Sequence, residues 1–205
     1  MDVRPIGCEA SAMGAAEKRV TNEELRRKVL DLPEGITGEV IDGVLYTMGR
    51  ARPAHQYVSG TIFSALEHGR RGGGPPPSGW LILPAVEIEF PTVESVAPDL
   101  SGWRRERVEG KSRENPMTVV PDWICEILSD STKAKDLGVK RELYARQGVK
   151  HAWIVDADAH IVEAFALNDQ RRWVLLGAWS EDATMDVAPF EGTPIKLENW
   201  WMKGA

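Results

Sequence analysis

The chain has 205 residues, of which 42% are hydrophobic, which is enough apolar material for one domain with a sizeable core. The net charge of −6 argues weakly against a nucleic-acid partner, and the two cysteines, Cys8 and Cys125, are too few and too far apart to suggest a disulfide framework. Residues 1–20 hold no apolar signal-peptide core, and no later stretch has the length of a membrane span. We therefore expect a soluble, cytoplasmic protein without a membrane partner, with a flexible leader over 1–20 and a single domain over 21–205.

The first predicted elements are a helix, a hairpin and a second helix. The segment "TNEELRRKVLDLP" opens with a capping box made by Thr21 and Glu24, which is a helix-start signal. The segment "GEVIDGVLYTM" predicts two short strands around the turn pair Asp42-Gly43. A second helix is expected to begin at Pro53 and to run to about residue 70.

The second half of the chain predicts a sheet with one helix between two strands. Extended segments are expected in "GWLILPAVEIEF" and in "VAPDLSGW", followed by a polar, basic stretch over 104–116. The strand "PDWICEILS", a helix over 133–147 and the strand "KHAWIVD" form a βαβ-like unit, and the strands "HIVEAFAL" and "RRWVLLGAW" follow it. A βαβ unit among hairpins predicts a mixed central sheet flanked by helices, in an α/β (α+β) domain.

The run "WICEIL" places one carboxylate, Glu126, in an otherwise apolar strand that reads as buried on both faces. Charged side chains are rarely buried unless they are paired or bind a metal. The plain alternative is an acid that pairs with a basic residue of the neighbouring helix.

Three further acids, Glu39, Glu87 and Asp99, lie in or beside apolar strands. Converging carboxylates bind hard cations such as Mg²⁺, usually together with phosphate oxygens of a substrate. Each acid also has an ordinary explanation, because Asp99 follows Pro98 as a turn or cap acid does, and Glu39 and Glu87 fit exposed strand positions. Asp122 is expected to be a strand-start residue, and His55 a structural histidine.

The centre of the chain is locally basic although the whole chain is acidic. Weak candidates for contacts with nucleic acid lie in the two basic segments on either side of the "WICEIL" strand, and they are Arg104, Arg105, Lys133 and Lys135. A solvated helix face and a polar loop explain the same charges, and the same default applies to Lys140, which is expected on a helix surface.

The segment "PDWICEILSDSTKAKDLGVKRELYARQGVKHAWIVD" resembles the core signature of the Uma-two family of bacterial restriction-endonuclease-like proteins, within the PD-(D/E)xK nuclease superfamily. The hairpin "GEVIDGVLYTM", the helix "PAHQYVSGTIFSAL" and the segment "VAPDLSGWRRER" resemble its upstream pieces in the right order, so the resemblance covers about residues 21–200. It implies a restriction-endonuclease-like core with a mixed sheet.

The resemblance also implies roles for individual residues. Asp99 and Glu126 match the two acids that bind the divalent metal, Mg²⁺ or Mn²⁺. Leu128 occupies the usual position of the superfamily lysine, and the matching lysine comes instead from the following helix as Lys140. Glu39 matches the acid of the hairpin, as a further ligand or a group that orients water. Asp130 stands where the family usually has a proline, which adds a charge near the site.

The resemblance, together with the residues that match it, implies a metal-dependent endonuclease that hydrolyses phosphodiester bonds in nucleic acid, with DNA as the expected substrate. The alternative is a nuclease-fold module that has lost turnover and keeps a binding or regulatory role. A third interpretation, a structural oligomer, leaves the acids without a purpose. The apolar late strands and "NWW" near the C-terminus predict apolar surface and a homodimer, unless these strands only complete the sheet.

Overall fold

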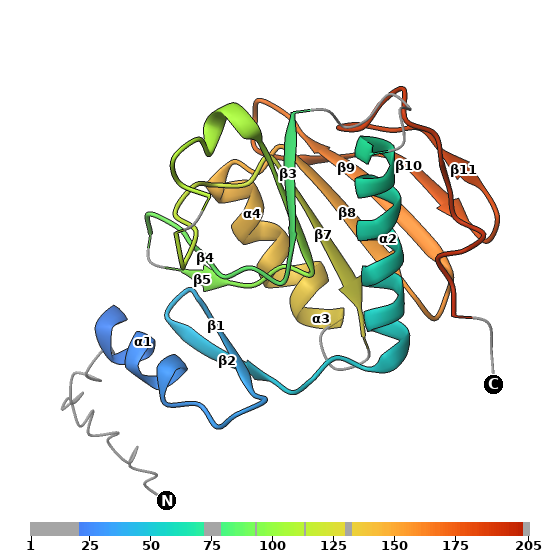
Figure 1. Cartoon of the computed structure of the whole chain (residues 1–205). Helices are drawn as coiled ribbons and strands as arrows, with labels where there is room; N and C mark the ends of the chain where they lie inside the picture. The colour runs from blue at the N-terminus through green and yellow to red at the C-terminus, as the bar shows by residue number, and fades with distance from the viewer. Residues whose placement is uncertain (1–20, 72–78, 93, 113, 130–132, 203–205) are drawn as a thin grey trace, which may run out of the picture.

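The computed structural model describes residues 21–71, 79–92, 94–112, 114–129 and 133–202, so the leader predicted over 1–20 lies outside the described residues. Within these ranges, no helix combines the length and the apolar character that are needed to cross a membrane. Two sheets, a long helix and a short helical segment make up most of the described chain (Figure 1).

A six-stranded sheet forms the centre of the molecule, in the order β10-β9-β8-β7-β6-β3. Only the neighbours β7 and β8 run parallel, and all other pairs in this sheet are antiparallel. The mixed sheet predicted from the sequence is therefore confirmed. Its strands are β3 (Trp80–Pro84), β6 (Leu100–Arg104), β7 (Trp123–Leu128), β8 (His151–Asp156), β9 (Ile161–Leu167) and β10 (Trp173–Ser180).

The connection between β7 and β8 is the predicted helical segment, but it is not one regular helix. It consists of α3 (Lys133–Lys135), a π-helical turn η2 (Asp136–Lys140) and α4 (Arg141–Gln147). Gly148 ends the segment in the left-handed conformation with a φ of 81°, which a glycine adopts without steric cost. Periodicity does not reveal the π turn, because one extra residue per turn leaves the apolar pattern on either side intact.

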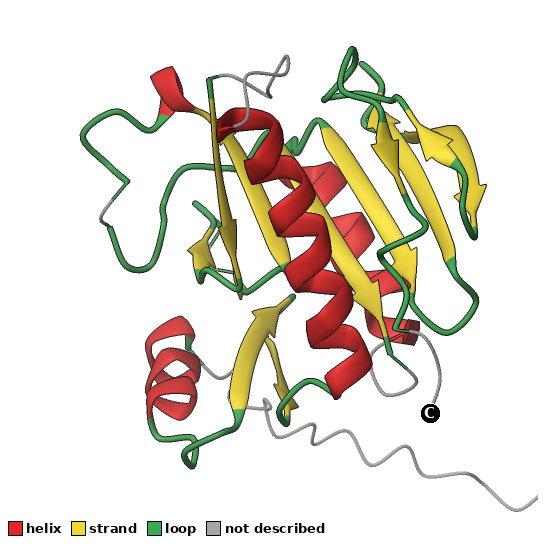
Figure 2. Cartoon of the chain, turned by 45° about the vertical axis from the view of Figure 1, so that its right-hand side comes forward, coloured by secondary structure: helices red, strands yellow, loops and turns green. Residues whose placement is uncertain are grey.

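Helices cover both faces of the central sheet. The long helix α2 (Pro53–Arg71) crosses one face, and the segment that contains α4 lies on the other (Figure 2). Trp123, Cys125 and Ile127 of β7 pack on the α2 side, whereas Ile124 and Leu128 pack with Leu143 and Tyr144 on the α4 side. All six residues of β7 are buried for this reason, as the apolar run "WICEIL" predicts.

Aromatic rings fill the core on the α2 side. Trp123 lies edge-to-face with Trp153 and with Phe190, in each case with 5.1 Å between ring centroids. Gly102 lets the rings approach the sheet, because a Cβ at this position would lie 3.1 Å from Trp123 and 3.3 Å from Trp80. Edge-to-face packing of this kind adds to the apolar burial that stabilises the sheet.

A smaller four-stranded antiparallel sheet lies beside the central one, in the order β2-β1-β5-β4. It contains the predicted hairpin, and α1 (Asn22–Leu30) packs on it after the predicted capping box of Thr21 and Glu24. The segment "VAPDLSGW" forms two strands rather than one, because the chain leaves the small sheet before Pro98 and begins β6 after Asp99. The strands are β1 (Thr37–Ile41), β2 (Val44–Met48), β4 (Ile88–Glu89) and β5 (Ser95–Val96).

The C-terminal segment folds back on the α2 side of the sheet. It contains the short pair β11 (Thr184–Met185) and β12 (Ile195–Lys196), and it places Trp200 and Trp201 in the core. The prediction that "NWW" offers apolar surface is therefore wrong for both tryptophans. The late strands β9 and β10 complete the sheet, but the edge strand β10 still exposes three apolar side chains, Val174, Leu175 and Leu176.

Candidate active site

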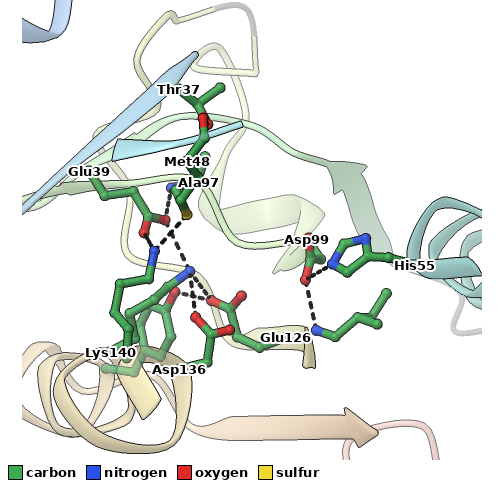
Figure 3. Close-up of polar contacts among 12 residues, drawn as sticks. Thr37, Glu39, Met48, His55, Ala97, Asp99, Glu126, Asp136 and Lys140 are labelled. Carbon is green, nitrogen blue, oxygen red and sulfur yellow. Dashed lines mark hydrogen bonds and ion pairs between the residues drawn. The ribbon is translucent and has the colours of Figure 1, made fainter. Parts of the chain in front are cut away.

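Asp99 directly precedes β6, and Glu126 lies in the neighbouring strand β7 of the central sheet. Leu100 of β6 pairs with Cys125 of β7 in antiparallel register, so Asp99 and Glu126 are the next residues to face one another. The backbone N–H of Ile127 donates a hydrogen bond of 2.7 Å to Asp99 Oδ2, which ties the two strands together at this point. Figure 3 shows both side chains in the same region of the site, as the resemblance implies.

Glu126 is fully enclosed, with 2% of its surface exposed. Its Oε1 lies 2.7 Å from Lys140 Nζ and also accepts a hydrogen bond from the hydroxyl of Tyr144. Among the described residues, no hydrogen bond reaches its second oxygen, Oε2. The plain explanation of Glu126, a buried acid paired with a lysine of the next helix, is therefore part of the geometry.

Lys140 binds three carboxylates at once. Its Nζ lies 3.0 Å from Glu39 Oε1, 2.7 Å from Glu126 Oε1 and 3.7 Å from Asp136 Oδ1 (Figure 3). Burial lowers the pKa of Lys140, but the three acids outweigh it and raise the pKa well above its ordinary value. The expectation of a surface lysine is wrong, because the π turn directs Asp136 and Lys140 together toward the sheet, where both are buried.

Glu39 extends from the hairpin and pairs with the ammonium groups of Lys140 and Lys135. Its Oε1 accepts from Lys140 and from the backbone N–H of Ala97, and its Oε2 lies 2.5 Å from Lys135 Nζ. Burial raises the pKa of Glu39, and the charges of Lys140 and Lys135 lower it by more, so the net pKa is below its ordinary value. Glu39 thus remains ionised, with both oxygens engaged.

Glu126 has the opposite electrostatic balance. Burial raises its pKa, Lys140 lowers it, and the neighbouring acids Asp136, Asp99 and Glu39 raise it again, with a net pKa of about 8. A buried carboxylate in a field of other carboxylates is relieved by either a proton or an added cation. Such a strongly perturbed group marks a candidate functional site.

Asp99 is the more accessible acid, with 22% of its side chain exposed. His55 Nε2, from the first turn of α2, lies 3.1 Å from Asp99 Oδ2, the same oxygen that accepts from Ile127. Burial lowers the pKa of His55, but the hydrogen bond and the charge of Asp99 outweigh it, so the pKa is raised.

Sequence reasoning missed four residues of this cluster. The sequence predicts a structural histidine at His55 and a weak nucleic-acid contact at Lys135, and it predicts no role for Asp136 or Tyr144. Lys135 has only 10% of its side chain exposed and also contacts Met48 Sδ at 2.7 Å. The spacing of four between Asp136 and Lys140, and again between Lys140 and Tyr144, was the available signal, because residues four apart share a helix face.

The other predicted basic residues lie apart from the carboxylates. Arg104 is the last residue of β6 and Arg105 follows it, so both lie at the far end of the strand from Asp99. Five residues at roughly 3.3 Å each place Arg104 about 17 Å from Asp99 along the strand. Lys133 begins α3 at the site end of the sheet and lies 2.7 Å from Asp156 Oδ2, with half of its side chain exposed. The four basic residues therefore do not form one surface around the acids, because the arginines and Lys133 lie at opposite ends of the sheet.

Two acids fit their ordinary explanations. Asp122 precedes β7 and accepts a hydrogen bond from the backbone N–H of Arg104, as a strand-start residue does. Glu87 is exposed as expected, although it directly precedes β4 and is not in a strand, and it accepts a hydrogen bond of 2.8 Å from the Ser95 hydroxyl. Neither contacts the cluster around Lys140.

The donor set around Asp99 and Glu126 fits a hard cation with few protein ligands. Within the described part of the chain, no group of three or more histidine, cysteine or acidic side chains is arranged to hold a metal ion. Mg²⁺ needs only one or two carboxylates, because waters and substrate phosphates complete its shell. Asp99 Oδ1 and Glu126 Oε2 are the oxygens that could serve as these ligands, since neither accepts a hydrogen bond from the residues described.

Comparison with solved structures supports the fold. A crystal structure from Anabaena variabilis ATCC 29413, of a putative nuclease belonging to DUF820, superposes with a TM-score of 0.68 at 19% sequence identity. The match covers 89% of this chain and 97% of that one. The restriction-endonuclease-like fold expected from the sequence is thereby confirmed.

Sequence comparison finds one protein that matches a short segment of the chain and one family that matches most of it. A segment of 75 residues, 37% of this chain, is 32% identical to the human protein named "Probable E3 ubiquitin-protein ligase HECTD4", and it spans only 2% of that protein's length. Residues 24–198 match the Uma2 family, whose description is "Putative restriction endonuclease". Because this match covers most of the chain and the fold agrees with it, the chain belongs to the Uma2 family.

Proposed function

We propose that this protein is a metal-dependent endonuclease that hydrolyses phosphodiester bonds in nucleic acid, with DNA as the substrate and Mg²⁺ or Mn²⁺ as the cofactor. The observation that carries the proposal is that Asp99, Glu126 and Lys140 come together from the start of β6, from β7 and from the π-helical turn. Family membership supports a nuclease, and the geometry supports the choice of these three residues.

Asp99 and Glu126 would hold the cation through their unengaged oxygens. A bound Mg²⁺ would supply Lewis-acid chemistry, which polarises the scissile phosphate and lowers the pKa of a bound water. A substrate would approach from the side of Asp99, which is the more exposed of the two acids, while Glu126 is buried in the sheet. A carboxylate in a buried strand is tolerable when a cation stands opposite it.

Lys140 supplies a permanent positive charge directly behind Glu126. It is held by three acids and stays protonated because they raise its pKa. A fixed charge next to the reacting centre favours the negative charge that builds on the phosphate oxygens, and it needs no reorganisation during the reaction. Glu39 has the role of an anchor for Lys140 and Lys135, since both of its oxygens are already engaged.

Nucleic acid would reach the site past Lys133, which is exposed at the same end of the sheet. Arg104 and Arg105 would contact only flanking sequence, because about 17 Å corresponds to roughly five base pairs at 3.4 Å each. We assign them a contribution to affinity and none to the chemical step.

A second candidate function is a nucleic-acid-binding or regulatory module without turnover. The observation that favours it is the closed set of ion pairs among Glu39, Lys135, Asp136 and Lys140, in which the lysine of the motif is nearly inaccessible. In that case the ion pairs stabilise the fold, and the acids bind a cation without cleavage.

We also propose that two copies associate through β10. Within the described chain this strand has a neighbour on one side only, and it exposes Val174, Leu175 and Leu176. A free strand edge is a template for pairing with another chain. Two copies of β10 running antiparallel about a two-fold axis would bring Arg172 near Asp182 of the other copy, so the charges at the two ends are complementary.

Nicking of supercoiled plasmid DNA tests the nuclease proposal. Wild-type protein should nick with Mg²⁺ or Mn²⁺ and not with a chelator, and Asp99→Asn and Glu126→Gln should each lower the rate by at least about a hundredfold. Both substitutions keep the shape of the side chain, and unfolding curves verify that each variant is folded. Retained DNA binding without nicking under either metal would favour the second candidate.

A further inference from the structure

His55 is the one described side chain that approaches Asp99 from outside the sheet. It lies in the first turn of α2, and its Nε2 is 3.1 Å from Asp99 Oδ2 (Figure 3). Only 14% of the His55 side chain is exposed, so the contact is sheltered from water. A hydrogen bond to a carboxylate that is shielded in this way is stronger than one at the surface.

Two donors reach the same oxygen of Asp99 from different elements. Ile127 N–H donates from β7 and His55 Nε2 from α2, both to Oδ2. A carboxylate with two fixed donors on one oxygen cannot rotate freely about its last bond. Oδ1 is left without a hydrogen bond from the described residues.

Glu126 shows the same arrangement. Lys140 and Tyr144 both donate to its Oε1, and its Oε2 is left without a donor among the described residues. Each of the two acids therefore has one oxygen occupied by protein donors and one oxygen available. Asp99 and Glu126 differ in this respect from Glu39, whose two oxygens both have protein donors.

The other ring nitrogen of His55 argues against a purely structural role. Nδ1 is buried and has no hydrogen-bond partner in the described chain. A buried polar atom without a partner costs about 1–3 kcal/mol, which an apolar ring of similar size would not incur. The contribution of the histidine ring is then its Nε2–H, which faces Asp99.

We infer that His55 is a positioning residue, which fixes the Asp99 carboxylate so that Oδ1 remains available to the cation. The inference rests on the proposed function, because it assigns Asp99 to the metal. His55 acts only through Asp99 and does not contact the substrate. Outer partners that orient metal ligands in this manner typically contribute a factor of 10 to 100 in metal affinity.

Calorimetric titration with Mn²⁺ alone, without nucleic acid, tests the inference. His55→Phe keeps a ring and removes the donor, so the dissociation constant should rise about 10- to 100-fold, while the melting temperature stays the same or rises. His55→Gln carries an N–H donor at a similar reach and should restore most of the affinity. His160→Phe is the matched control, because His160 pairs with Glu181 away from the site, and it should bind as the wild type does.

The outcomes separate this inference from the proposed function. Wild-type binding that is lost in Asp99→Asn but unchanged in His55→Phe would overturn the positioning role and leave the metal site in place. Weakened binding in both His55→Phe and His55→Gln, with a lowered melting temperature in each, would make His55 a structural residue. A wild-type protein that binds no Mn²⁺ would overturn the metal site and the role of His55 together.

Discussion

Lys140 Nζ lies 2.7 Å from Glu126 Oε1, although the two residues come from a π-helical turn and from a central strand. Both side chains are buried, and each compensates the charge of the other. Removing one partner of such a pair leaves an uncompensated charge in the interior, which costs more than the pair itself contributes. The cluster is therefore sensitive to every substitution that changes its net charge.

Lys140→Ala should destabilise the protein by about 3–5 kcal/mol, because Glu39, Glu126 and Asp136 would lose their shared cation. Urea unfolding of both proteins measures the difference. Lys133→Ala is the control, since Lys133 is half exposed, and its free energy of unfolding should change by less than about 0.5 kcal/mol. Equal stabilities of the Lys140 and Lys133 variants would show that the buried ion pairs do not form in solution.

The stability of the metal-free protein should fall as pH rises from about 5 to 8. The folded-state pKa of Glu126 is about 8, raised first by burial, whereas its ordinary value is 4.5. A raised pKa means that the folded state holds the proton more tightly, so the stabilisation is complete below the unfolded pKa and is lost as pH approaches 8. Glu126→Gln cannot ionise and should reduce this slope, as denaturant unfolding in chelator at several pH values would reveal. Parallel slopes in both proteins would assign the pH dependence to other groups.

The salt dependence of DNA binding should distinguish Lys133 from Lys135. Loss of one phosphate contact reduces the slope of log affinity against log salt by about 1. Lys133→Ala should show this reduction, because the side chain is exposed at the site end of the sheet. Lys135→Ala should leave the slope unchanged, because only 10% of the Lys135 side chain is exposed and its ammonium group is held by buried Glu39. Fluorescence anisotropy with a duplex in a Glu126→Gln background, which prevents cleavage, measures both slopes. A matching reduction for Lys135 would place it in contact with the substrate.

Leu175→Glu should convert a dimer into a monomer. It introduces a charge into the exposed apolar segment of β10, and pairing of two copies along β10 would bury that charge in the interface. Sedimentation velocity at micromolar concentration detects the change. Met202→Glu alters an equally exposed apolar residue outside β10 and should leave the mass unchanged. A monomeric wild type would remove the proposed association.

The sequence was sufficient for the sheet and for four members of the candidate site, for identifiable reasons. The apolar run around Glu126 predicts a strand covered on both faces, and the order of motifs identifies Asp99, Lys140 and Glu39 by resemblance. Features of this kind can be predicted from the sequence because they depend on residues that are close together in the chain. The hairpin turn at Asp42-Gly43 and the capping box at Thr21 were predicted on the same basis.

The remaining features depend on long-range contacts. His55 meets Asp99 across 44 residues and Lys135 meets Glu39 across 96, and no local pattern encodes either pair. The burial of Lys140 required the π turn, which a helical periodicity does not reveal. Lys135 looked like a surface lysine because its sequence neighbours are charged and polar, but tertiary contacts with the hairpin enclose it.

Lys135 and Lys140 both reach Glu39 only because the π turn has the number of residues that it has. Leu143 and Tyr144 hold the following helix in place against the core, so a residue removed from the turn, such as Gly138, would be absorbed on the N-terminal side. Each residue of an α-helix subtends about 100°, so Lys135 would swing away from Glu39 while Tyr144 kept its contact with Glu126. The number of residues in this turn therefore determines whether one lysine can reach the hairpin while Tyr144 reaches the central sheet. A relative with a shorter turn would need a different cation to neutralise the acid of its hairpin.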